Sequence, residues 1–131
     1  MTPFTLNLLD GQGSHRFNQV TRFVGTDRTG AFGILARHAP MVALLRHGLA
    51  RFSDPEGTWR YLSLPGGVLS FSDNTLTIVA VRYFLGTDRA QIVAQLEADM
   101  ANTDSEIHRA QATLAEIEQS LMRRLAEMSR G

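Results

Sequence analysis

The sequence contains no cysteine, which excludes disulfides, thiolate metal sites and cysteine nucleophiles. Lysine is also absent, so all 13 basic residues are arginines, and 13 acids balance them to a formal net charge of +0. A general nucleic-acid-binding protein usually has a clear basic excess, so that class is not expected. The chain has no apolar run long enough to span a membrane and no signal-peptide pattern. We therefore expect a soluble intracellular protein of one domain, with or without an appendage.

Charge and sequence pattern divide the chain near residue 86. Residues 1–85 hold eight arginines and five acids, a net charge of +3, whereas residues 86–131 hold five arginines and eight acids, a net charge of −3. In the first part, Phe4, Leu6 and Leu8 alternate with polar residues, as in a half-buried strand. Many short strand-like segments with turns between them point to a β-sandwich or β-barrel.

Turn signals predict where these strands end. We expect a strand from Phe17 to Val24, and then a polar loop from Gly25 to Gly30. Arg46-His47-Gly48 and Pro65-Gly66-Gly67 are expected to break the strands around them. Ser72-Asp73-Asn74 is typical of a hairpin turn.

The segment from Thr87 to Met128 has neither glycine nor proline and is rich in helix-forming residues. Thr87 or Asp88 is the expected N-cap. Apolar residues recur every seven positions, and a second series lies between them at the three-residue offset. The first series is Val93, Met100, Ile107, Leu114, Leu121 and Met128, and the second is Leu96, Ala110 and Ile117.

The second series is interrupted at Thr103 and Arg124. Because Thr103 and Glu106 match a capping box, we favour two helices, over about 88–101 and 104–128. A single continuous rod of about 60 Å, at about 1.5 Å per residue, is the alternative. An isolated narrow apolar stripe is only marginally stable in water, so it must pack on another surface.

The most distinctive stretch is Gly30-Ala31-Phe32-Gly33-Ile34-Leu35, which His38-Ala39-Pro40 follows closely. Two glycines around Phe32 suit a tight bend or a close approach of another strand. Ala39 is pushed toward extended geometry by Pro40, which donates no ladder hydrogen bond. These residues predict a strand that ends in a rigid corner, and we expect Gly33→Val to disrupt it.

This stretch resembles the Gly-x-Phe-Gly-Ile-Leu-Pro-Gly-His-Ala-Pro pattern of the epsilon subunit of rotary F-type ATP synthases. Gly66-Gly67-Val68-Leu69 is similar to that family's second glycine-rich stretch. The resemblance covers essentially the whole chain and implies an α+β fold. It implies an N-terminal antiparallel β-sandwich over residues 1–85 and a C-terminal helical domain over 86–131, folded as a two-helix hairpin. Ala36-Arg37 replaces the family's Pro-Gly, so the corner is expected to be less rigid and more basic.

The family resemblance implies a non-catalytic rotor subunit of the central stalk, which couples the catalytic head to the membrane c-ring. It implies that the sandwich docks on the gamma subunit and the c-ring. It also implies a location at the cytoplasmic face of the inner (plasma) membrane, within a peripheral complex. The residues expected to bind these partners are Gly30, Phe32, Gly33, His38 and Pro40.

The resemblance also implies that the helical tail regulates ATP hydrolysis, either folded on the sandwich or extended toward the head. Arg123 and Arg124 would then meet acidic residues of the beta subunit, or they are simply two solvated arginines. The segment Leu121–Leu125 looks more like the sodium-coupled class of these ATPases than the ordinary bacterial one. Removal of residues 88–131 is expected to leave a folded sandwich.

No residue pattern predicts an enzyme. The four histidines lack metal-ligand spacing, and neither a serine-hydrolase elbow nor a phosphate loop is present. Leu85–Ala90 departs from the nucleotide-binding motif of some epsilon subunits, so we expect no bound nucleotide, cofactor or metal. One alternative is a small-ligand-binding β-sandwich, for example with a cupin-like metal site. The other is a homo-oligomeric adaptor that assembles through the heptad stripe.

Overall fold

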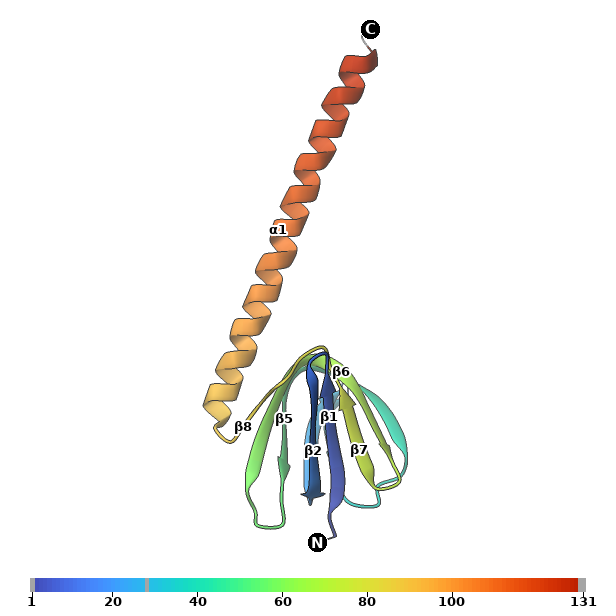
Figure 1. The fold of residues 1–131 in the computed structure, drawn as a ribbon, viewed down its shortest axis with the longest axis vertical. Helices are drawn as coiled ribbons and strands as arrows, with labels where there is room; N and C mark the ends of the chain where they lie inside the picture. The colour runs from blue at the N-terminus through green and yellow to red at the C-terminus, as the bar shows by residue number, and fades with distance from the viewer. Residues whose placement is uncertain (1, 28, 130–131) are drawn as a thin grey trace. The chain divides into compact units, whose positions relative to one another are not determined.

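The computed structural model describes residues 2–27 and 29–129, which form eight strands and one helix (Figure 1). The strands are β1 (Phe4–Asp10), β2 (Gly13–Val20), β3 (Arg22–Asp27), β4 (Gly30–Ile34), β5 (Met41–Ser53), β6 (Trp59–Ser72), β7 (Thr75–Val79) and β8 (Phe84–Gly86), and the helix is α1 (Arg89–Ser129). The chain divides into two compact units, Met1–Glu97 and Ala98–Gly131. The first unit therefore holds the strands and the first turns of α1.

The strands follow one hydrogen-bonded path in the order β2-β1-β7-β6-β5-β3-β4, with β8 paired to β6. The expected antiparallel arrangement holds for most pairs, but β1 and β7 are parallel. Parallel neighbours need a long connection. Here β2 to β6 form that connection. Because β1 and β7 are so distant in the sequence, local patterns do not predict their pairing.

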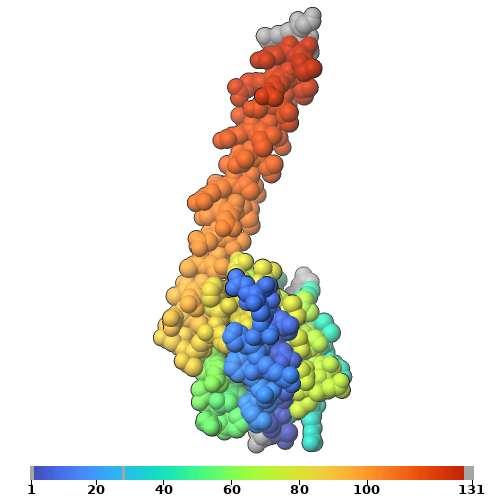
Figure 2. All heavy atoms as spheres, viewed as in Figure 1, coloured from blue at the N-terminus to red at the C-terminus, as the bar shows by residue number. Residues whose placement is uncertain are grey.

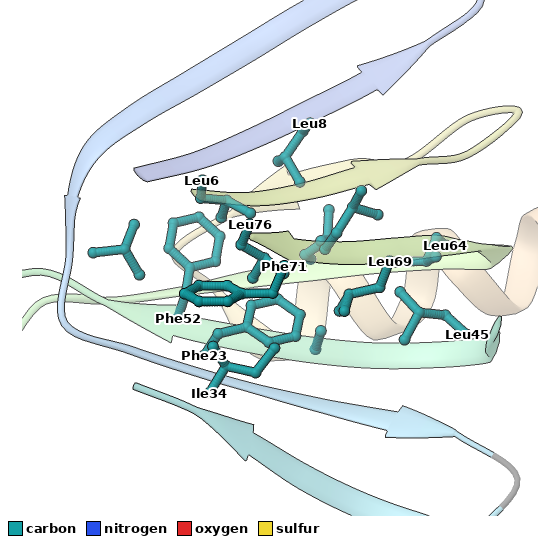
Figure 3. Packing of buried hydrophobic residues seen from close by; sticks show 14 of the residues in the cluster. Leu6, Leu8, Phe23, Ile34, Leu45, Phe52, Leu64, Leu69, Phe71 and Leu76 are labelled. Atoms are coloured by element: carbon teal, nitrogen blue, oxygen red, sulfur yellow. The ribbon is translucent and has the colours of Figure 1, made fainter. Parts of the chain in front are cut away.

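The core lies inside the folded sheet. The alternation expected in β1 is confirmed, because Phe4, Leu6 and Leu8 are each at most 1% exposed. Figure 3 shows Leu6 and Leu8 on one side of this core and Phe23 and Ile34, from β3 and β4, on the other. Burial of such side chains stabilises a fold by about 1.5–3 kcal/mol each. This apolar interior holds the strands together.

The two expected strand breaks are wrong, because β5 and β6 each run through them. Their ladder pairs Arg46 with Gly66 and Gly48 with Leu64, so the register continues past Pro65. A proline removes one ladder hydrogen bond without ending its neighbours' pairing. Gly67 has a different reason to be glycine: a Cβ there would lie 2.7 Å from the carbonyl oxygen of Val79. The glycine permits close approach to β7.

Two further strand boundaries also differ from the sequence expectation. The strand expected over 17–24 is two strands, which separate at Thr21. The Thr21 N–H donates to the carbonyl oxygen of Ser53 at 2.8 Å, so this residue is bound at the end of β5. The loop expected over 25–30 is mostly strand, because β3 continues to Asp27 and β4 begins at Gly30.

The tail is a single helix rather than the expected pair of helices over 88–101 and 104–128. Asp88 is the N-cap, as expected, because its Oδ1 accepts hydrogen bonds from the N–H groups of Ala90 and Gln91. Thr103 does not cap a second helix. Its hydroxyl donates to the carbonyl oxygen of Asp99 at 3.0 Å, the bond to the preceding turn that threonine makes inside helices.

Candidate partner-binding surface

Strand β4 carries three of the five residues that the sequence suggests for partner binding, and it lies at the end of the strand path. Gly30 opens the strand with a φ of 121°, a value that favours glycine. Phe32 is half-buried and packs toward Phe23, with ring centroids 6.5 Å apart. Phe32 therefore contributes to the core as well as to the surface.

Gly33 is exposed, and the space beside it is open. A Cβ on this residue would meet the carbonyl oxygen of Phe23 at 3.8 Å, an ordinary contact. Neither its backbone conformation nor its surroundings require glycine. The steric reason for expecting Gly33→Val to disrupt the corner is therefore absent.

The corner after β4 is a tight turn centred on Arg37. The N–H of His38 donates to the carbonyl oxygen of Leu35 at 3.2 Å, and Arg37 has a φ of 63°. An L-residue in this left-handed conformation costs roughly 1–2 kcal/mol. The turn persists because the N–H of Arg37 donates to Oδ1 of Asn74 at 2.8 Å. Ala36-Arg37 thus keeps a turn whose geometry suits glycine.

Asn74 fastens this corner to two other segments, a role that the sequence analysis missed. Its side-chain amide donates to the carbonyl oxygen of Pro3 at 3.1 Å. Its own carbonyl oxygen accepts from the N–H of Thr5 at 3.2 Å. The φ of 55° at Asn74 matches the expected hairpin turn, since asparagine tolerates this region. Only the tertiary structure reveals the bonds to Arg37, Pro3 and Thr5.

His38 and Pro40 are exposed on the segment between β4 and β5. The His38 ring stands edge-on to Phe71, with centroids 5.8 Å apart and planes at 79°. Its Nδ1 lies 2.7 Å from the carbonyl oxygen of Ala39. These contacts hold the imidazole at the corner. The structure thus places His38 and Pro40 on the segment that follows β4.

A row of exposed apolar side chains crosses the outer surface of β5, β6 and β7. Leu44 pairs with Val68, and Val68 pairs with Val79. Their exposed fractions are 67%, 43% and 51%. The sequence contains one signal for this outer row, because Met41 to Leu45 is apolar at every position. A strand with one face in water normally alternates.

The tail exposes both arginines that the sequence suggests, Arg123 and Arg124. Apolar side chains along this unit are also exposed: Ile107, Leu114, Ile117, Leu121, Met122, Leu125 and Met128. In Figure 2 the residues of this unit, coloured orange to red, form a column one helix thick.

Two aspartates of the sandwich accept hydrogen bonds within turns. The Thr58 N–H, with help from Arg60, lowers the pKa of Asp54, and the Thr29 hydroxyl lowers the pKa of Asp27. Over residues 2–27 and 29–129 no group of three or more metal-ligating side chains occurs. A hollow of about 420 Å³ opens near Thr21 and Asp54, whose polar side chains already bond to neighbouring residues. The small-ligand alternative gains no support from it.

The described helix has no stretch that is apolar enough over a sufficient length to cross a membrane. What the fold presents instead is a rigid sandwich with an apolar outer row and a helix with an exposed apolar stripe. Exposed contiguous apolar surface marks places where partners bind. The molecule has the features of a docking subunit.

The family description "ATP synthase, Delta/Epsilon chain, beta-sandwich domain" matches residues 3–86. The chain belongs to this family. It is 31% identical to ATP synthase epsilon chain 2 of Cereibacter sphaeroides over 76% of this chain and 68% of that protein. It is 32% identical to the ATP synthase epsilon chain of a Psychrobacter species over 79% of this chain and 78% of that protein.

Solved structures share the fold. A chain of the Euglena gracilis mitochondrial ATP synthase aligns with a TM-score of 0.59 and 20% identity, over 77% of this chain and 67% of that one. A chain from the central stalk and c-ring of the Tetrahymena thermophila mitochondrial ATP synthase aligns with a TM-score of 0.53 and 16% identity, over 64% and 69%. The sandwich and following helix expected from the sequence are confirmed, with one helix in place of two.

Proposed function

We propose that this chain is a non-catalytic subunit of the central stalk of an F-type ATP synthase. In this role it turns with the rotor and links the catalytic head to the membrane c-ring. The observation that supports the proposal is the family match over the sandwich, together with the exposed apolar row on its outer surface. A location at the cytoplasmic face of the inner membrane, within the peripheral complex, follows from this role.

The outer row of Leu44, Val68 and Val79 is the proposed contact with the gamma subunit. Stable interfaces have an apolar centre with a polar rim, and this row supplies such a centre. Each side chain that becomes buried there stabilises the complex by about 1–2 kcal/mol, because it starts partly covered. The row spans three paired strands, so it is presented on a rigid surface.

The corner beside β4 is the proposed contact with the c-ring. It exposes Arg37, His38 and Pro40 on a turn that Asn74 fastens, so polar loops of a partner would meet fixed groups. Gly30, Phe32 and Gly33 belong to this surface through the edge strand β4, whose free side is available to a neighbour. The tail then acts at the catalytic head, with Arg123 and Arg124 facing acidic residues of the beta subunit.

Co-purification with the gamma subunit of the same organism tests the role of the outer row. The wild-type chain is expected to form a stoichiometric complex, and Leu44→Asp is expected to weaken it by about 100-fold, since a charge would be buried in an apolar contact. Ser14→Asp is the matched control, because it adds the same charge at an exposed strand position of β2. Equal binding by both variants would contradict the row as the contact, and no binding by the wild type would contradict the family role.

ATP hydrolysis by the assembled complex tests the role of the tail. We expect a complex with the chain truncated after Glu97 to hydrolyse ATP faster than the wild type. Arg123→Ala with Arg124→Ala should reproduce part of this gain. Unchanged hydrolysis in an intact, coupled complex would contradict regulation by the tail while leaving the rotor role in place.

A further inference from the structure

The tail carries an apolar seam that its own unit leaves uncovered. Its members are Ile107, Ala110, Leu114, Ile117, Leu121 and Met128, which occupy alternating three- and four-residue spacings except for one gap at Arg124. Ile107, Leu114, Ile117 and Leu121 are between 51% and 60% exposed. This spacing is that of a helix which packs along another helix.

The residues that border the seam are acidic or uncharged. Each heptad has two positions that border the seam. Between residues 104 and 120 there are six such positions, and together they hold three acids and no arginine. They are Asp104, Glu106, Gln111, Thr113, Glu118 and Ser120. Arg109 and Arg123 lie at heptad positions on the opposite face. Bordering charges set which helix pairs with which, because opposite charges face each other across the contact.

A second copy of the tail is a poor match for this seam. Residues 98–131 hold four arginines and six acids, so two copies, each with a net charge of −2, repel. Parallel copies would place Arg124 against itself. Antiparallel copies centred on Leu114 would bring Arg124 to Asp104 but leave Glu106 and Glu118 opposite the uncharged Met122 and Ala110.

We propose that the seam docks on a helix of a partner chain whose apolar stripe is bordered by arginine or lysine, with an acid opposite Arg124. The apolar side chains supply the contact area, and the acids Asp104, Glu106 and Glu118 select a cationic border. This proposal concerns the chemistry of the partner and does not depend on which complex the chain joins.

Two synthetic peptides of about 28 residues, or four heptads, test the proposal with the full-length chain. Both have leucine and isoleucine in the seam, and one has lysine at all bordering positions where the other has glutamate. Titration calorimetry is expected to show binding of the lysine peptide about tenfold or more above that of the glutamate peptide. Binding should weaken with added salt. A lysine peptide with a scrambled seam controls for charge alone and is expected not to bind.

Variants of the chain locate the contact. Glu106→Arg with Glu118→Arg is expected to reverse the preference between the two peptides. Glu116→Arg, on the opposite face of the helix, is the matched control and should leave the preference unchanged. Leu114→Asn is expected to remove binding, while circular dichroism confirms that the helix remains.

Three outcomes would overturn the proposal. Equal binding of the two peptides would exclude charge selection, and equal binding of the lysine peptide by Leu114→Asn would exclude the seam. Sedimentation of the wild type as a dimer that excludes the lysine peptide would show that a second copy is the occupant.

Discussion

The sandwich and the tail treat their apolar residues in opposite ways. In the sandwich, Phe71 and Leu69 are at most 1% exposed, whereas Leu114 in the tail is 60% exposed. The sandwich is held by contacts within itself. The tail has helical propensity and no internal core, so its conformation depends on what covers its seam. The sandwich thus buries its large apolar side chains, whereas the tail leaves its seam exposed.

The largest expected effect is the difference in stability loss between two substitutions, one in the core of the sandwich and one in the seam of the tail. Phe71→Ala is expected to lower the free energy of unfolding by about 3–5 kcal/mol, because it leaves a cavity in the core. Leu114→Ala should change it by no more than about 0.5 kcal/mol, because that side chain faces solvent. Urea unfolding of both variants measures the difference. Equal losses would show that the tail has a core of its own.

The second prediction concerns the residue at which the sandwich unit ends. Ile92 and Leu96 are 3% and 8% exposed within the first unit, although they belong to α1. Truncation after Glu97 should therefore leave the cooperative thermal transition unchanged. Truncation after Gly86 should cost about 2–4 kcal/mol, because it removes both buried side chains. Identical transitions would place the boundary at 86, where the sequence pattern predicts it.

The third prediction concerns the bonds that make the sandwich rigid. Asn74→Ala is expected to destabilise the sandwich by about 2–3 kcal/mol, because it removes the side-chain bonds to Arg37 and Pro3 and disfavours the left-handed backbone. Asn74→Gly keeps the backbone conformation available and isolates the loss of the bonds. Denaturant titration should rank wild type, Asn74→Gly and Asn74→Ala in decreasing stability. A reversed order of the two variants would contradict the account.

The smallest expected effect is a gain. Arg37→Gly should stabilise the sandwich by about 1 kcal/mol, since it relieves a left-handed L-residue. Gly33→Val is the comparison, because its backbone and surroundings admit a side chain, and it should fold with nearly unchanged stability. Thermal unfolding distinguishes the two. If Arg37→Gly instead lowers the stability, the arginine side chain must stabilise the sandwich by more than its left-handed backbone destabilises it.

Much of the sandwich could be predicted from local patterns. The alternation in β1 and the composition after Gly86 indicated the strand and the helix. Pro65 was misleading because it lies within a ladder that continues around it. Thr103 was misleading because its hydroxyl bonds to the preceding turn of the same helix instead of capping a new one. The outer row of Leu44, Val68 and Val79 required strand register, which no short segment specifies.

The position of β1 between β2 and β7 has a consequence for synthesis. The hairpin partner β2 emerges from the ribosome directly after β1, but β7 emerges only after β3 to β6. Pairings between segments so distant in sequence slow folding, into the range of milliseconds to seconds for β-rich domains. The second edge of β1 in the nascent chain therefore stays open until β7 is released, and the sandwich closes only after that point.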